Sequence, residues 1–217
     1  MENKSVKSNN TIKVAIAISS FSESPYIIDS NRKKFTSIAN KKEWTHGDMI
    51  EMLLSLHIVL EVGLNYLFRH LAIYKLKKQV DKIDVIKNID EISFKDKLTL
   101  FIYNSSFDFG DKLPEASEHH KIINIVKDFA GIRNKIMHGH AIATINEEGS
   151  SKHTALRKLV LTDDALREQI SKYKKIVDGV NFYLDSLSDK SFQPQIQHYK
   201  KYIAYDFIPK ALISNHG

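Results

Sequence analysis

The sequence predicts a mainly helical bundle with a small β-hairpin, and three observations support this fold class. Glycine and proline are scarce, with 8 and 4 among 217 residues, and they lie mostly outside the long periodic segments. The middle of the chain carries long segments with apolar residues at helical spacing. Residues 141–161 instead alternate around an "EEGSS" turn, which is typical of a hairpin.

The first predicted helix spans about residues 47–78. Thr45 is its expected N-cap, and Asp48 three positions later completes an acidic variant of the capping box. Its interior, "MIEMLLSLHIVLEVGLNYLFRHLAIYKL", is apolar nearly all round, which predicts a central helix covered on several sides. A shorter helix, "SFKDKLTLFIYNSS", is predicted from about Ser93.

A third helix is predicted from about Glu118 to His138, where Gly139 suits the C-terminal position. After the hairpin, the polar run from Thr162 opens a long amphipathic helix, "DDALREQISKYKKIVDGVNFYLDSL".

Both ends of the chain lack a clean period. We therefore divide the sequence into an N-terminal extension of unclear structure (residues 1–43), a helical core (44–188) and a C-terminal tail (189–217). The tail is expected to pack on the core or on a partner subunit. Its aromatic residues could stack single-stranded bases instead; they are Tyr199, Tyr202, Tyr205 and Phe207.

Composition narrows the classes of function. The chain has no cysteine, which excludes thiol catalysis, cysteine-based zinc sites and disulfides, and fits a reducing compartment. The run "VAIAI" is too short for a signal-peptide core, and no run approaches a membrane span, so we expect a cytoplasmic protein without a membrane partner. The net charge of +6, spread over lysine pairs, favours a polyanion or simply keeps the protein soluble.

The strongest chemical signal is "GIRNKIMHGH", residues 131–140. At roughly 100° per residue, Arg133 falls near the middle of an apolar arc on the third helix. A guanidinium on such a face needs a carboxylate, a phosphate or a cavity to receive it. The apolar members of the arc are Ile122, Ile125, Val126, Phe129, Ile132, Ile136 and Met137.

Asn134 and His138 lie one turn apart at the edge of this arc. The helix dipole favours protonated His138. A group that titrates near neutrality beside a fixed cation suits phosphodiester chemistry, because one moves a proton while the other stabilises charge. The alternative is structural, with Arg133 extending to solvent and His138 capping its helix.

The central helix carries a matching polar row of His57, Glu61 and Asn65, one residue per turn. Glu61 is the expected partner of Arg133 if the two helices pack face to face. Because buried ion pairs contribute little to net stability, such a pair would serve to hold the arginine for a ligand.

A metal site is not expected. Two histidine pairs, His119 with His120 and His138 with His140, lie roughly 27 Å apart along one helix and cannot share an ion within a chain. We expect no metal and no cofactor, since glycine-rich phosphate loops, G-x-S-x-G elbows and paired carboxylates are also absent from the sequence.

Arg133, four intervening residues beginning with Asn134, and then His138 resemble the Arg-X4-6-His signature of the HEPN superfamily. "LHIVLEVGLNYLF" resembles the first long helix of that family and "SFKDKLTLF" the second, so the resemblance covers about Thr45 to Leu187. It implies a helical bundle that forms a homodimer through the motif helix. Many members are metal-independent endoribonucleases in toxin–antitoxin and antiviral defence systems.

Carried onto this chain, the resemblance implies that His138 acts as general base or acid on the RNA 2′-hydroxyl. Arg133 would stabilise the phosphate and Asn134 would orient the site, giving a 2′,3′-cyclic phosphate and a 5′-hydroxyl. Glu61 is our own addition as a supporting residue.

One position departs from the family pattern. His140 stands where toxins silenced by a nucleotidyltransferase have a tyrosine, so adenylylation there cannot control this chain. Control by an antitoxin that sequesters the protein is left as an alternative. His140 itself either assists phosphate binding or only lies on the loop. Two other functions stay open: a catalytically silent HEPN-like module for nucleotide or RNA binding or for assembly, and a helical partner-binding protein whose motif is coincidental.

Overall fold

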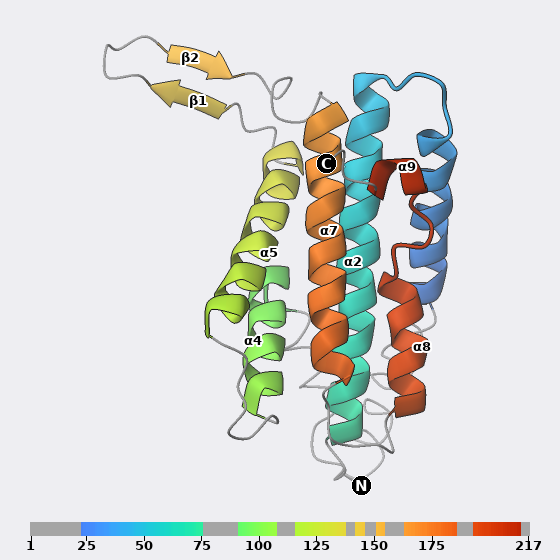
Figure 1. Ribbon diagram of the computed structural model, residues 1–217, viewed down its shortest axis with the longest axis vertical. Coiled ribbons are helices and arrows are strands. Elements are labelled where there is room, and N and C mark those ends of the chain that lie inside the picture. The colour runs from blue at the N-terminus through green and yellow to red at the C-terminus, as the bar shows by residue number, and fades with distance from the viewer. Residues whose placement is uncertain are drawn as a thin grey trace, which may run out of the picture.

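The structure is a computed structural model, and it describes residues 23–75, 91–107, 116–137, 142–145, 151–154, 163–185 and 193–213. These residues form a mainly helical bundle, which confirms the predicted fold class (Figure 1). Helix α2 (His46–Lys75) and helix α7 (Asp163–Asp185) lie side by side at the centre of the bundle and run in the same direction.

Helix α2 spans His46–Lys75 and begins where the sequence predicts. The backbone N–H of Asp48 donates to Thr45 Oγ1 over 3.1 Å, and the Thr45 N–H donates in return to Asp48 Oδ2 over 3.0 Å. This confirms the reciprocal cap. The hydrogen bond from Lys41 Nζ, 2.6 Å long, and the bonds from Thr45 lower the pKa of Asp48 to about 2. The cap is therefore charged at any ordinary pH.

Helix α2 is covered on several sides, as its composition predicts. It contacts α5 (Ala116–Met137), α7 (Asp163–Asp185) and α8 (Gln193–Ile203). Among the described residues, the stretch His46–His70 has the length and mean hydropathy, 1.4, to cross a membrane. Inside the bundle 56% of its most apolar window is buried, and a core helix passes the same test.

Helices α4 (Phe94–Phe107) and α5 lie side by side on one flank of the bundle, and α7 packs against both (Figure 1). Ser93 caps α4, because its Oγ accepts the backbone N–H of Asp96 over 3.2 Å. One face of α7 is buried along its whole length. It contributes Leu166, Ile170, Tyr173, Ile176, Val177, Val180, Tyr183 and Leu184 to the core.

The predicted hairpin is present as two short strands, β1 (Ile142–Ile145) and β2 (Ser151–Thr154). They pair antiparallel, with Ile142 opposite Thr154 and Ile145 opposite Ser151. The hairpin follows α5 and projects away from the helices (Figure 1). It therefore marks the end of the bundle toward which the motif-bearing helix points.

The first and last described segments of the chain meet on the other flank. The helix of residues 23–39, blue in Figure 1, lies beside α8 and α9 (Lys210–Ile213). Phe35 meets Phe207 edge to face at 5.4 Å between ring centroids, and Thr36 Oγ1 donates to the Phe207 carbonyl over 2.9 Å. Buried side chains from both ends join one core cluster with α2 and α7; they are Ile28, Phe35, Ile38, Ile196, Tyr199, Ile203, Ile208 and Leu212.

Candidate functional site

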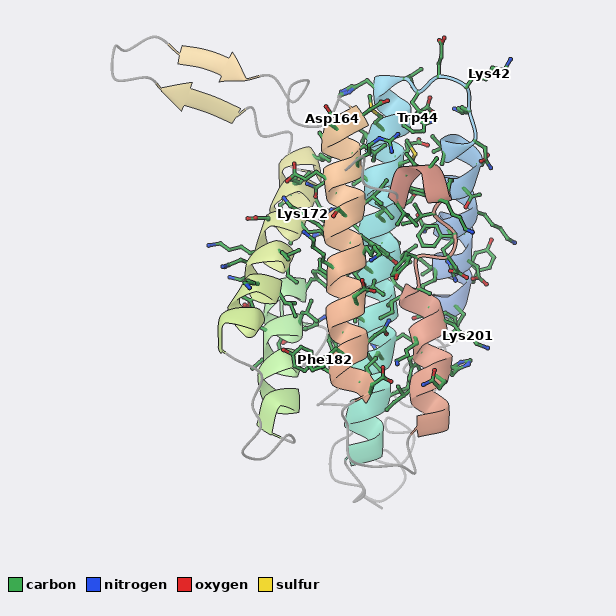
Figure 2. All side chains as sticks on the ribbon, in the orientation of Figure 1. Lys42, Trp44, Asp164, Lys172, Phe182 and Lys201 are labelled. Carbon is green, nitrogen blue, oxygen red and sulfur yellow. The ribbon has the colours of Figure 1, made fainter. Side chains whose placement is uncertain are left out.

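A pocket of about 910 Å³ lies among α2, α4, α5 and α7. Its volume is in the range of pockets that take small ligands. Its wall mixes polar and apolar surface and carries charges of both signs. The cations are Lys95, Lys97, Lys127, Arg133 and Lys172, and the acids are Glu61, Glu91, Asp128 and Glu168. Positive side chains thus outnumber negative ones by one, and Figure 2 marks Lys172 on α7 beside α5.

Arg133 reaches this pocket from α5. Its Nη2 lies 3.4 Å from Glu61 Oε2 on α2, and its Nη1 donates to Asn134 Oδ1 over 3.2 Å. The predicted ion pair between Arg133 and Glu61 is therefore present. The pair is not buried, however, since the two side chains keep 40% and 30% of their surface exposed. The guanidinium leaves the apolar arc by extending to the wall of the pocket.

The arc itself follows the prediction where it is described. Val126 and Phe129 are buried, while Ile122, Ile125, Ile132 and Ile136 are partly buried against the core. Arg133 thus sits on a core-facing helix surface without entering the core. The carboxylate that pairs with the guanidinium belongs to Glu61 of the neighbouring helix α2, as predicted from the spacing of polar residues on that helix.

Three of the five predicted site residues are described, namely Arg133, Asn134 and Glu61, and they lie together. Helix α5 ends at Met137. His138 and His140 follow it and lie outside the described residues. Their proposed roles stay predictions from the sequence.

His57, the first member of the polar row on α2, is buried with 5% of its surface exposed. Its ring stacks on Phe129 of α5, with centroids 3.7 Å apart. Burial lowers the pKa of His57 to about 3, and the positive charge of Arg133 acts in the same direction. His57 is therefore neutral near pH 7, and its Nε2 has no hydrogen-bond partner among the described residues.

Gln169 of α7 lines the same pocket and was missed by the sequence analysis. It is 3% exposed, and its Oε1 also has no hydrogen-bond partner within the described part of the chain. The available signal was a glutamine on the apolar face of an amphipathic helix. Unpartnered buried polar atoms are uncommon in proteins, so two on one pocket wall mark this region as unusual.

Lys97 of α4 is a second residue that the sequence analysis missed. Only 7% of its surface is exposed, and its Nζ donates to Asn65 Oδ1 on α2 over 3.0 Å. Asn65 is the last member of the polar row, so the whole row lines the pocket. Two successive turns of α2, at Glu61 and Asn65, thus contact a cation from two different helices.

The other sites considered from sequence receive no support. Among the described residues, no group of three or more histidine, aspartate or glutamate side chains could hold a metal ion. The tail aromatics pack on the protein's own helices: Tyr66 of α2 meets Tyr199 at 5.5 Å and Tyr202 at 5.3 Å between ring centroids. Tyr199 is 5% exposed, so stacking of bases on its ring would require the tail to leave α2.

No protein-family model, no curated protein and no solved structure matches the chain.

Proposed function

We propose that the chain is a metal-independent endoribonuclease of the HEPN type. In this reaction the 2′-oxygen of a ribose attacks the adjacent phosphorus, and the bond from phosphorus to the 5′-oxygen breaks. A 2′,3′-cyclic phosphate and a 5′-hydroxyl result. The main support is the position of Arg133, which pairs with Glu61 at the wall of a pocket lined by charged side chains and lies five residues before His138.

Each motif residue has a role in this proposal. His138 moves the proton of the 2′-hydroxyl or of the leaving 5′-oxygen. Arg133 donates hydrogen bonds to phosphoryl oxygens as their charge grows. Asn134 accepts a hydrogen bond from Arg133 and so orients the guanidinium.

The alternative of a silent module for nucleotide or RNA binding, or for assembly, would be favoured if Arg133 were used up in a closed contact. A guanidinium carries five N–H donors. Among the described residues Arg133 contacts Glu61 and Asn134, and 40% of its side chain is exposed. Donors therefore stay available to a ligand, which supports a site that binds RNA over a module that serves only for assembly.

The wider proposal is a cytoplasmic toxin or antiviral defence effector that acts on RNA. Two chains that pair through α5 would bring two copies of Arg133 and His138 into one cleft, as the resemblance implies. A composite site of this kind would explain why a single chain shows an arginine with donors available. A neutralising partner would then act by covering the cleft.

The test compares the wild-type chain with His138→Ala and Arg133→Gln on an RNA of mixed sequence, in EDTA, with analysis of the fragment ends. We expect cyclic-phosphate ends from the wild type and none from either variant. His198→Ala, which removes an exposed histidine on α8, is the matched control and should cleave like the wild type. Inactivity of a folded dimer on several classes of RNA would favour the silent module, and unchanged cleavage by His138→Ala would contradict the assigned role.

A further inference from the structure

Two neighbouring positions of α2 hold cations from two other helices at the same pocket. Glu61 contacts Arg133 of α5 at 3.4 Å, and Asn65 accepts a hydrogen bond from Lys97 of α4 at 3.0 Å. All four residues line the pocket. We propose that Lys97 is a second phosphate-binding residue, positioned by Asn65, and that the RNA backbone passes between Lys97 and Arg133. This inference rests on the proposed function.

The burial of Lys97 is the first reason. Lysine is almost never fully buried unless its ammonium group has a partner, because desolvating the charge is costly. Lys97 is 7% exposed and lines a pocket that also carries charged side chains from α2, α5 and α7. A buried lysine at a pocket wall is thus a candidate for binding an anion there.

The nature of its anchor is the second reason. Asn65 contacts Lys97 through a neutral amide oxygen, so this one contact orients the ammonium group without itself adding a negative charge. Glu61, by contrast, offsets part of the charge of Arg133. One row of α2 therefore orients two cations in different ways.

The spacing of the two anchors is the third reason. Glu61 and Asn65 lie one helical turn apart, about 6 Å along α2. Two cations held at successive turns suit two neighbouring phosphates of one strand better than a single phosphate group. Arg133 would contact the scissile phosphate, since it belongs to the motif, and Lys97 the phosphate beside it.

The remaining charges on the pocket wall do not oppose this assignment. Lys172 and Glu168 pair with each other at 2.8 Å. Lys95 lies on α4 two positions before Lys97 and adds positive charge on the same helix. Glu91 and Asp128 are exposed, so solvent screens them more strongly than the buried ammonium.

A purely structural role for Lys97 makes a different prediction at Asn65. The substitution Asn65→Asp keeps an oxygen beside Lys97 and adds a negative charge. If Lys97 only stabilises the fold, the new ion pair should leave the protein as stable as the wild type and RNA binding unchanged. If Lys97 binds phosphate, Asn65→Asp should weaken that binding although the melting temperature is kept.

The experiment measures binding without cleavage, on the full-length chain. A single-stranded 2′-deoxy oligonucleotide lacks the attacking hydroxyl, and its affinity is followed by fluorescence anisotropy over a series of salt concentrations. For single strands, each phosphate contact contributes about 0.7 to the slope of log affinity against log salt. Lys97→Met should lower that slope by about 0.7 and weaken binding about tenfold. Lys33→Met, on the exposed face of the helix of residues 23–39, should change neither.

The outcomes separate the two proposals. Reduced slopes in Lys97→Met and Asn65→Asp, together with no cleavage of RNA by the wild type, would support the phosphate site and contradict the ribonuclease. Wild-type slopes in both variants, together with RNA cleavage that depends on His138, would overturn the phosphate site alone. A separate titration with inorganic phosphate distinguishes the source of the anion. If Lys97→Met lost phosphate binding but kept the wild-type salt slope for the oligonucleotide, the ligand of Lys97 would be a free anion. That result would overturn the proposal that Lys97 binds the RNA backbone.

Discussion

The ring of His57 on α2 stacks on the ring of Phe129 on α5, with centroids 3.7 Å apart and planes inclined by 21°. Both side chains are buried. The contact joins the central helix to the motif-bearing helix one turn from the pair of Glu61 and Arg133. A neutral histidine at this place lets two helices pack closely beside a guanidinium.

The stability of the fold should depend on the protonation of His57. Burial lowers its pKa in the folded chain from an ordinary value of 6.5 to about 3, and Arg133 contributes. Below about pH 6.5 the unfolded chain therefore binds a proton at His57, whereas His57 of the folded chain stays neutral until the pH approaches 3. The stabilisation is complete above pH 6.5 and is lost as the pH falls toward 3, at up to about 1.4 kcal/mol per pH unit.

The measurement is urea unfolding at pH 7, 6, 5 and 4 for the wild type and His57→Phe. Phenylalanine keeps the stack on Phe129 and removes the unpartnered Nε2. We expect the variant to be at least as stable as the wild type at pH 7, because an unmet buried polar atom costs about 1–3 kcal/mol. The free energies of the two proteins should diverge as the pH falls, and parallel curves would contradict the assignment.

The helices around the pocket could be predicted because each carries its own signal. The caps at Thr45 and Ser93 lie in the sequence next to the helices that they begin. The helix of residues 23–39 and α8 could not be predicted in this way. Their buried residues gain partners only in the folded chain: Tyr199 of α8 meets Tyr66 of α2, and Phe35 meets Phe207 across 172 positions of the chain.

The pocket was predictable only in part, for a similar reason. The polar row on α2 and the arginine on α5 each break an apolar pattern, so the ion pair of Glu61 with Arg133 follows from helical spacing. Lys97 breaks no clear pattern in "FKDKLTLF". Its meaning depends on Asn65, which lies 32 positions earlier and meets it only in the folded chain.

Two helical glycines should respond differently to alanine. A Cβ on Gly63 of α2 would lie 2.7 Å from the branched Cγ2 of Ile203, whereas one on Gly179 of α7 would lie 2.8 Å from the terminal Cδ1 of Ile122. The end of Ile122 can rotate away, but the methyl of Ile203 is fixed close to its own backbone. We expect Gly63→Ala to lower the free energy of unfolding by about 1–3 kcal/mol. Gly179→Ala should be neutral or stabilising by up to about 1 kcal/mol, through helix propensity.

Thermal and urea unfolding of both alanine variants test this contrast. A rescue variant sharpens the test: Ile203→Leu lacks the branched methyl, so adding it to Gly63→Ala should recover part of the lost stability. Equal destabilisation at both glycines would show that the approach of Ile203 does not limit the packing of α8 on α2.

Arg32 should stabilise the packing of the helix of residues 23–39 against the described C-terminal segment. Its guanidinium pairs with Asp206, donates to the Lys201 carbonyl over 3.1 Å and lies 4.9 Å from the centre of the Phe207 ring. Only 17% of its side chain is exposed, while that of Asp206 is 75% exposed. The stabilisation therefore comes from the Lys201 carbonyl and the Phe207 ring more than from the ion pair with Asp206.

We expect Arg32→Met to lower the free energy of unfolding by about 1–3 kcal/mol. Asp206→Asn should change it by less than about 1 kcal/mol, and the exposed control Lys33→Met by less than about 0.5 kcal/mol. Urea unfolding of the three variants gives the comparison. If Asp206→Asn lowered the free energy of unfolding as much as Arg32→Met does, the ion pair would provide most of the stabilisation and the prediction would be wrong.

Glu61 should matter for activity and little for stability, and the chain offers a matched control on the same helix. Glu51 pairs with Lys34 at 3.2 Å and, like Glu61, keeps much of its side chain exposed. Pairs of this kind contribute about 0–1 kcal/mol, so Glu61→Ala and Glu51→Ala should unfold at similar urea concentrations.

If Glu61 fixes Arg133 for the proposed cleavage of RNA, Glu61→Ala should slow that cleavage about 10- to 100-fold, because a misplaced group loses catalytic geometry. Glu51→Ala should cleave at the wild-type rate, and Glu61→Gln, whose amide oxygen still accepts a hydrogen bond, should keep most of the activity. Equal rates for both alanine variants would show that the ion pair leaves the reacting geometry unchanged.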